Sequence, residues 1–144
     1  NKIKNDNSIL STLNYTNYID YKSIDYVFLS NSYRVFTEIK KILTIKKVKI
    51  IMPYYELLKN TFKKFKNKFF FFNIRKKNKF DLFKDGCCFK KNLVLVYSLA
   101  FGINKKFSNI IIYGLTKDSN NKKIINDVKS YLKINSLKTK ILIK

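Results

Sequence analysis

The chain has 144 residues, of which 46% are hydrophobic and 28% charged, so it suits one domain with its own core and not a wholly disordered protein. Its formal net charge is +22, from 31 basic and 9 acidic residues. The longest apolar run, residues 93–103, has about half of the roughly 20 residues that a membrane-spanning helix needs. We therefore expect no association with a membrane. The chain begins at Asn1 without a signal-peptide pattern, and we interpret it as a fragment or a processed chain.

Apolar residues follow first a strand pattern and then a helix pattern near the N-terminus. Residues 24–29 (IDYVFL) predict a strand, and the polar turn Ser30 to Ser32 follows it. The next apolar side chains lie on one face of a helix, at Val35, Phe36, Ile39, Ile42 and Leu43. Residues 9–13 could form an earlier strand. We assign residues 1–23 as an N-terminal strand and loop segment of the same domain, and residues 24–144 as its main α/β part.

The middle of the chain continues this alternation. Residues 48–52 predict a strand, and Pro53 suits the first turn of a helix that continues to residue 65. Residues 68–74 contain four consecutive phenylalanines and predict a strand buried on both faces. Asp85-Gly86 is the clearest turn signal. Residues 89–103 predict a central helix, apolar almost all round, for which Gly102 is a plausible end.

The C-terminal third predicts a βαβ unit. Residues 108–114 (SNIIIYG) give the strongest strand signal, and a last strand falls at residues 140–143. Between them lies a helical pattern, with apolar side chains at Ile124, Ile125, Val128, Tyr131 and Leu132. Such units give parallel strands. We therefore predict a single three-layer, Rossmann-like α/β domain with a mostly parallel sheet of about five strands.

Three loops are candidate ligand sites. In an open parallel sheet, ligands bind beyond the carboxyl ends of the strands, where strand order reverses. The predicted binding residues are Ser30, Asn31, Ser32 and Arg34 after the first strand, Gly86 and Asn92 before the central helix, and Gly114, Thr116 and Asp118 after the strongest strand.

Each loop also has a purely structural interpretation. Ser30 to Ser32 could bind a phosphate at a helix N-terminus with help from Arg34, or could simply cap that helix. Gly114 would let the backbone approach a ligand, or the segment up to Asp118 could be a strand-to-helix turn that caps the last helix. Asp85-Gly86 could be a plain turn.

Catalytic groups are scarce. The chain has no histidine and no Gly-rich phosphate-binding motif. Its acidic residues show no spacing that would pair two of them as a general acid and a general base. Adjacent cysteines rarely form a disulfide, so we expect Cys87 and Cys88 to be free thiols in a reducing, cytoplasmic compartment. A thiolate nucleophile there would need a neighbouring lysine. We leave the catalytic residues unassigned and expect neither a metal nor a cofactor.

Five segments in order carry a resemblance: VFLSNSYRVF, a strand, FFFFN, DGCCFKKNLVLVYSLAFGI and NIIIYGL. This order resembles the Rossmann-like C-terminal domain fused to aldolase-like barrels of the hydroxy-oxovalerate aldolase type in bacterial surface-polysaccharide loci. It is similar, more distantly, to the nucleotide-binding core of bacterial sialyltransferases. The resemblance covers roughly residues 24–144. Where these families place an acidic residue two positions after the last glycine, this chain has Thr116, and the sialyltransferase histidine is absent.

The resemblance implies an accessory or binding domain of a carbohydrate biosynthesis enzyme that takes a sugar, a nucleotide-sugar or a phosphorylated metabolite. A catalytic aldolase-type domain would lie upstream, or the chain would be a degenerate glycosyltransferase-like domain. The alternative is a basic nucleic-acid-binding protein of ribosomal type. The 29 lysines against 2 arginines also fit the codon bias of an AT-rich genome, and they recur in almost every segment, which favours the first interpretation. A third possibility is a chain without a ligand site that serves only in assembly.

Overall fold

The computed structural model describes residues 8–14, 18–29, 32–45, 47–53, 68–90, 94–116 and 118–144. The chain divides into two compact units, Asn1–Phe72 and Asn73–Lys144. The described residues form a mostly parallel sheet of six strands, a separate pair of parallel strands and three α-helices. This arrangement confirms the α/β class and the mostly parallel sheet. The assignment of 24–144 as one Rossmann-like domain stays a prediction.

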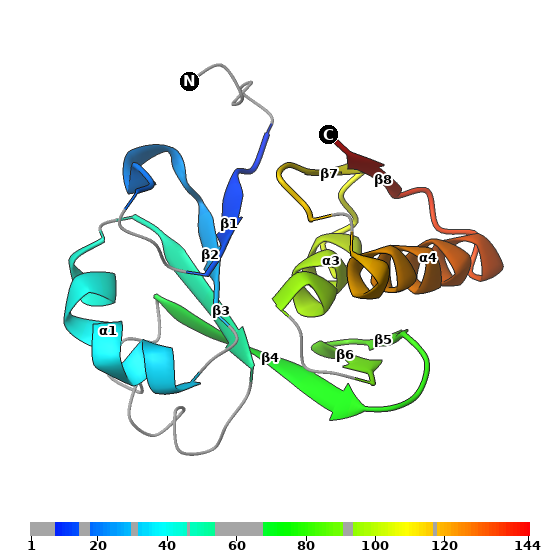
Figure 1. The fold of residues 1–144 in the computed structure, drawn as a ribbon, viewed down its shortest axis with the longest axis horizontal. Helices are drawn as coiled ribbons and strands as arrows, with labels where there is room; N and C mark the ends of the chain where they lie inside the picture. Colours follow the sequence, from blue (N-terminus) through cyan, green and yellow to red (C-terminus); the bar gives the residue numbers. More distant parts are fainter. Residues whose placement is uncertain are drawn as a thin grey trace. The chain divides into compact units, whose positions relative to one another are not determined.

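Parallel strands in chain order form the sheet of the first unit. They are β1 (Ser11–Leu13), β2 (Tyr26–Phe28), β3 (Lys49–Pro53) and the first half of β4 (Phe69–Lys76). The 3-10 helix η1 (Tyr21–Ser23) precedes β2, and helix α1 (Ser32–Thr44) joins β2 to β3 beside the sheet (Figure 1). Because β1 to β4 are in chain order, strand order does not reverse among them.

The core of this unit joins α1 to the sheet. Val35 and Ile42 of α1 are buried in one cluster with Ile50 and Met52 of β3, as the helical spacing predicts. At the C-terminal end of α1, the Lys68 ammonium donates hydrogen bonds to the carbonyl oxygens of Leu43 (2.9 Å) and Ile45 (2.6 Å). A cation at this position complements the unpaired carbonyls of a helix end.

Two local expectations differ from the structure in this unit. Pro53 is the last residue of β3 and not part of the first turn of a helix, and the helix predicted beyond it falls on residues 54–67, outside the described ones. In the phenylalanine run, Phe69 and Phe72 are buried but Phe70 is 40% exposed. The run is therefore not buried on both faces throughout.

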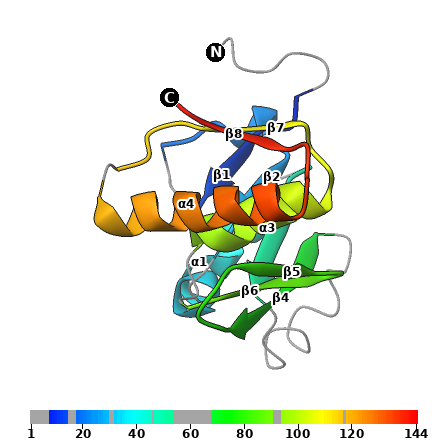
Figure 2. The ribbon, with the colours of Figure 1, turned by 90° about the vertical axis from the view of Figure 1, so that its right-hand side faces the viewer.

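The second unit has α3 (Val94–Asn104) and α4 (Ser119–Ile134) as its central layer. Figures 1 and 2 show these helices side by side between the pair β7 (Asn109–Ile112) and β8 (Lys140–Ile143) and the hairpin β5 (Asp81–Phe83) and β6 (Gly86–Phe89). Strand β6 pairs parallel to the second half of β4 and antiparallel to β5. Strands β7 and β8 are parallel and are joined through α4, which confirms the βαβ unit.

Helix α3 is buried on most of its surface, as its apolar sequence predicts. Its bounds differ from the expected ones, because Phe89 belongs to β6 and Gly102 lies inside the helix. A Cβ at Gly102 would lie 2.8 Å from Ile110 Cδ1 of β7, so the glycine allows a close helix-to-strand approach. Despite its apolar character, α3 is too short to cross a membrane, and no other helix in the described parts of the chain is long and apolar enough to do so.

Both helices of this unit end in the same backbone motif. The Phe107 and Leu137 amides donate to the carbonyls of Gly102 and Leu132, at 3.1 and 2.9 Å. The residues before them, Lys106 and Ser136, have φ angles of 58° and 51°. These are Schellman ends with a non-glycine residue in the left-handed region, where a side chain is strained.

We expect Ser136→Gly to raise the free energy of unfolding by about 0.5–1 kcal/mol, because glycine enters the left-handed region without the Cβ penalty. Urea denaturation followed by circular dichroism measures the change. Ser130→Gly, at an exposed position inside α4, is the control and should lower stability by a similar amount. Equal losses in both variants would contradict the assigned helix end.

Candidate functional site

The structure separates the predicted binding residues into different surroundings. Ser30, Asn31 and Asn92 lie outside the described residues. Ser32 is the first residue of α1, and Arg34 follows within its first turn, in the first unit. Gly114, Thr116 and Asp118 lie in one loop of the second unit, between β7 and α4. Only this last group of predicted residues is brought together by the described structure.

Gly86 has a packing role that accounts for the absence of a side chain. It starts β6, is buried, and follows the turn at Lys84 and Asp85. A Cβ built on Gly86 would overlap the carbonyl oxygen of Asn73 and the ring of Phe83. The Asn73 amide donates to the Asp85 carbonyl at 2.9 Å, which holds β4 against this turn. The close backbone approach by itself requires glycine here.

The loop after β7 opens a stretch of backbone to solvent. Gly114 has φ = 66°, in the left-handed region that favours glycine, and no atom of the described residues lies within 4 Å of a Cβ built on it. The preceding residue, Tyr113, is 51% exposed. A ligand can therefore approach the Gly114 backbone closely beside an accessible aromatic ring.

Three polar residues form a fixed cluster at the start of α4. Asp118 is the N-cap, and one of its carboxylate oxygens accepts from the Asn121 amide at 2.8 Å. The other oxygen accepts from the Thr116 hydroxyl and from the Asn121 side-chain amide, both at 2.8 Å. The Asn121 side chain also donates to the Thr116 hydroxyl and carbonyl oxygens, at 2.9 and 3.1 Å. This Thr116–Asp118–Asn121 cluster is exposed and orients its polar atoms before any ligand arrives.

Hydrogen bonding keeps the Asp118 carboxylate ionised. The Asn121 backbone amide, followed by the Thr116 hydroxyl, lowers the pKa of Asp118 below its ordinary value. Capping therefore accounts for this residue in structural terms. Because both carboxylate oxygens already accept hydrogen bonds, the cluster offers a ligand mainly its remaining lone pairs.

The end of β8 adds a cation to the same edge. Since β7 and β8 are parallel, their carboxyl ends lie together, and the Lys144 amide donates to the Ile112 carbonyl at 2.9 Å. The Lys144 ammonium lies 6.0 Å from the centre of the Tyr113 ring. We define the β7 loop site as the residues of this loop, the first turn of α4 and the end of β8: Tyr113, Gly114, Thr116, Asp118, Asn121 and Lys144.

Sequence reasoning did not single out three of these residues. Tyr113 continues the alternation of Asn109 and Ile111 on one face of β7, and this period of two could have predicted its exposure. Asn121 stands three positions after the cap, a spacing typical of helix starts. Lys144 carries no local signal, because only the pairing of β8 with β7 places it near Tyr113.

The two cysteines belong to the protein interior. Cys87 and Cys88 are free and only 0% and 3% exposed. Burial, followed by the neighbouring Cys88 sulfur, raises the pKa of Cys87 to about 12, so this thiol stays protonated near neutral pH. Among the residues that the structure describes, no group of three or more histidine, cysteine or acidic side chains is arranged to hold a metal ion.

Comparison with known protein families, with curated proteins and with solved structures finds no significant match for this chain.

We expect Gly86→Ala to lower the free energy of unfolding by about 1–3 kcal/mol, because the added methyl group overlaps the Asn73 carbonyl and the Phe83 ring. Chemical denaturation of the variant measures the loss. Ser130→Ala, on the exposed surface of α4, is the control and should leave stability nearly unchanged. A Gly86→Ala variant with the same free energy of unfolding as the native chain would show that the tight packing around this glycine is absent.

We expect Asp118→Ala to lower the melting temperature by a few degrees at pH 7. Since the folded-state pKa of Asp118 lies below the unfolded value, the carboxylate stabilises the fold above the unfolded pKa, and this contribution is lost as the pH falls through the folded pKa. The gap between native chain and variant should therefore close in acid. Thermal melts between pH 2 and pH 7 test this, and a gap independent of pH would exclude the charged cap.

Proposed function

We propose that this chain is an accessory binding domain of a carbohydrate biosynthesis enzyme and that the β7 loop site binds a sugar, a nucleotide-sugar or a phosphorylated metabolite. The observation that carries the proposal is the open backbone at Gly114 beside the exposed Tyr113 ring and the Thr116–Asp118–Asn121 cluster. This combination supplies backbone, aromatic and polar contacts within one loop.

Each part of the β7 loop site suits a different part of such a ligand. The Tyr113 ring can stack on the apolar face of a sugar or on a nucleotide base. The Lys144 ammonium, a point charge near that ring, can contact a phosphate. The oxygen atoms of Thr116 and Asp118 can accept hydrogen bonds from sugar hydroxyl groups. A phosphorylated sugar would use all three contacts.

The same proposal includes the Rossmann-like layering and a cytoplasmic location. The binding role is supported by the position of the β7 loop site beyond the carboxyl ends of the parallel strands β7 and β8, which form a pair separate from the six-stranded sheet. The reaction itself is assigned to an upstream catalytic domain of the aldolase type.

Thermal denaturation with added ligand tests this function. UDP-N-acetylglucosamine, glucose 6-phosphate and glucose serve as probes, each at low and at high salt. A bound ligand stabilises the folded state by RT ln(1 + [L]/Kd), so we expect a saturable rise of a few degrees with at least one probe.

Two matched variants connect the shift to the site. Tyr113→Leu should abolish the rise by removing the ring. Tyr18→Leu, at a tyrosine that is 97% exposed in the first unit, should retain it. A chain whose melting temperature responds to none of the probes, or to the same extent in both variants, does not bind these ligands at the β7 loop site.

A further inference from the structure

Helix α4 concentrates positive charge on one flank. Lys122, Asn126, Lys129 and Lys133 follow one another at spacings of four, three and four residues. At 100° per residue these side chains fall within a narrow arc of about 60°. All four are exposed. We call this set the α4 flank.

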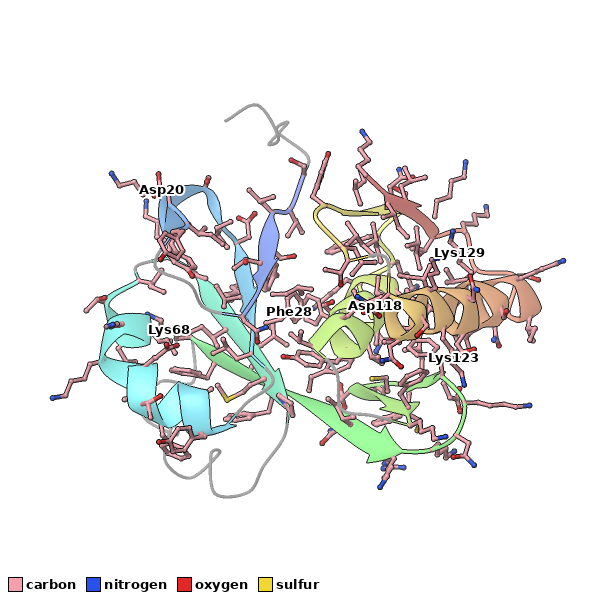
Figure 3. The ribbon with its side chains drawn as sticks, viewed as in Figure 1. Asp20, Phe28, Lys68, Asp118, Lys123 and Lys129 are labelled. Atoms are coloured by element: carbon pink, nitrogen blue, oxygen red, sulfur yellow. The ribbon has the colours of Figure 1, made fainter. Side chains whose placement is uncertain are left out.

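The neighbouring strip of the helix surface has a different composition. It presents Lys123, Asp127, Ser130 and Ile134, with one acidic and one basic residue four positions apart. Figure 3 shows Lys129 and Lys123 on different sides of α4. The α4 flank therefore has three lysines and no acidic residue, whereas the neighbouring strip has one of each.

Strand β8 and the turn before it carry further lysines. Lys138, Lys140 and Lys144 are exposed there. From residue 119 to residue 144 the chain holds seven lysines and one aspartate. Within the described parts of the chain, no carboxylate forms an ion pair with the lysines of the α4 flank, and Asp118 at the start of the helix is held by its own hydrogen bonds. The positive charge of the flank is therefore available to a partner.

We propose that the α4 flank binds the phosphate backbone of a nucleic-acid strand. The distance from Lys122 to Lys133 along the helix is roughly 16 Å at 1.5 Å per residue, which is long enough to follow a few consecutive phosphates of a strand. The flank holds no apolar side chain to bury against an amphipathic peptide or a lipid surface. Contacts from its lysines to phosphates would position a strand and carry no sequence information. This inference does not rest on the proposed function.

Fluorescence anisotropy with a labelled 20-nucleotide oligo(U) RNA tests the proposal. The variant K122Q/K129Q/K133Q removes three charges from the flank and keeps good helix-forming residues. The control, K22Q/K40Q/K41Q, removes the same charge from exposed lysines of the first unit. Circular dichroism melts establish that both variants fold.

The expected loss follows from counterion release. Each lysine contact contributes about 0.7 to the slope of log affinity against log salt for a single strand, so three contacts contribute about 2. The flank variant should bind the RNA about 100-fold more weakly at 0.1 M salt, with a slope smaller by about 2. The control should stay within a few-fold of the native chain.

Two results would overturn this assignment. Equal weakening of both variants would mean that net charge alone attracts the RNA. Tighter binding to poly-glutamate, or to vesicles with 30% phosphatidylserine, than to the RNA would assign the flank to an acidic protein or to a membrane surface.

Discussion

The burial of α3 is the constraint on which the second unit depends. Its side chains are apolar on nearly all sides, and each large one that met water would cost about 1.5–3 kcal/mol. Such a helix needs cover on both sides, which the β5–β6 hairpin and the β7–α4–β8 unit provide. Two contacts show this cover directly: Ile110 of β7 packs at Gly102, and the Asn104 side-chain amide donates to the Phe83 carbonyl of β5 at 3.1 Å. The outer elements are therefore positioned by one apolar helix.

The β7 loop site follows from the same constraint. Helix α4 buries Ile124, Ile125, Val128 and Leu132, which fixes its rotation and the place where its first turn begins. The cap at Asp118 then fixes the loop back to Gly114, and the parallel pairing of β7 with β8 brings Lys144 to the same edge. Since capping engages the Asp118 carboxylate, this group offers a ligand only its remaining lone pairs, beside the Tyr113 ring, the Gly114 backbone and the Lys144 ammonium.

The sequence predicted the elements whose patterns are local and regular, and it did not predict those set by distant contacts. The apolar faces of α1 and α4 and the last strand at residues 140–143 follow from periodicity alone. Phe89 lies in β6 and not in the predicted helix, because a short apolar run fits a buried strand and a buried helix equally well. Gly102 looked like a helix end, yet it is a glycine because Ile110 packs against it. Within the site, Gly114, Thr116 and Asp118 follow one strand in the sequence and could be predicted from it. The place of Lys144 beside Tyr113 depends on the pairing of β8 with β7 and could not.

The number of lysines says less about function than their placement. A basic composition alone is explained by codon bias, and it predicts lysine on every exposed surface. On α4 the lysines instead fall mainly on one flank, while the hydrogen-bonded carboxylate of Asp118 stands at the N-terminal end. The flank begins at Lys122, four residues beyond this carboxylate. The β7 loop site and the α4 flank are therefore adjacent, since the flank begins one residue after Asn121 and runs along the helix to Lys133.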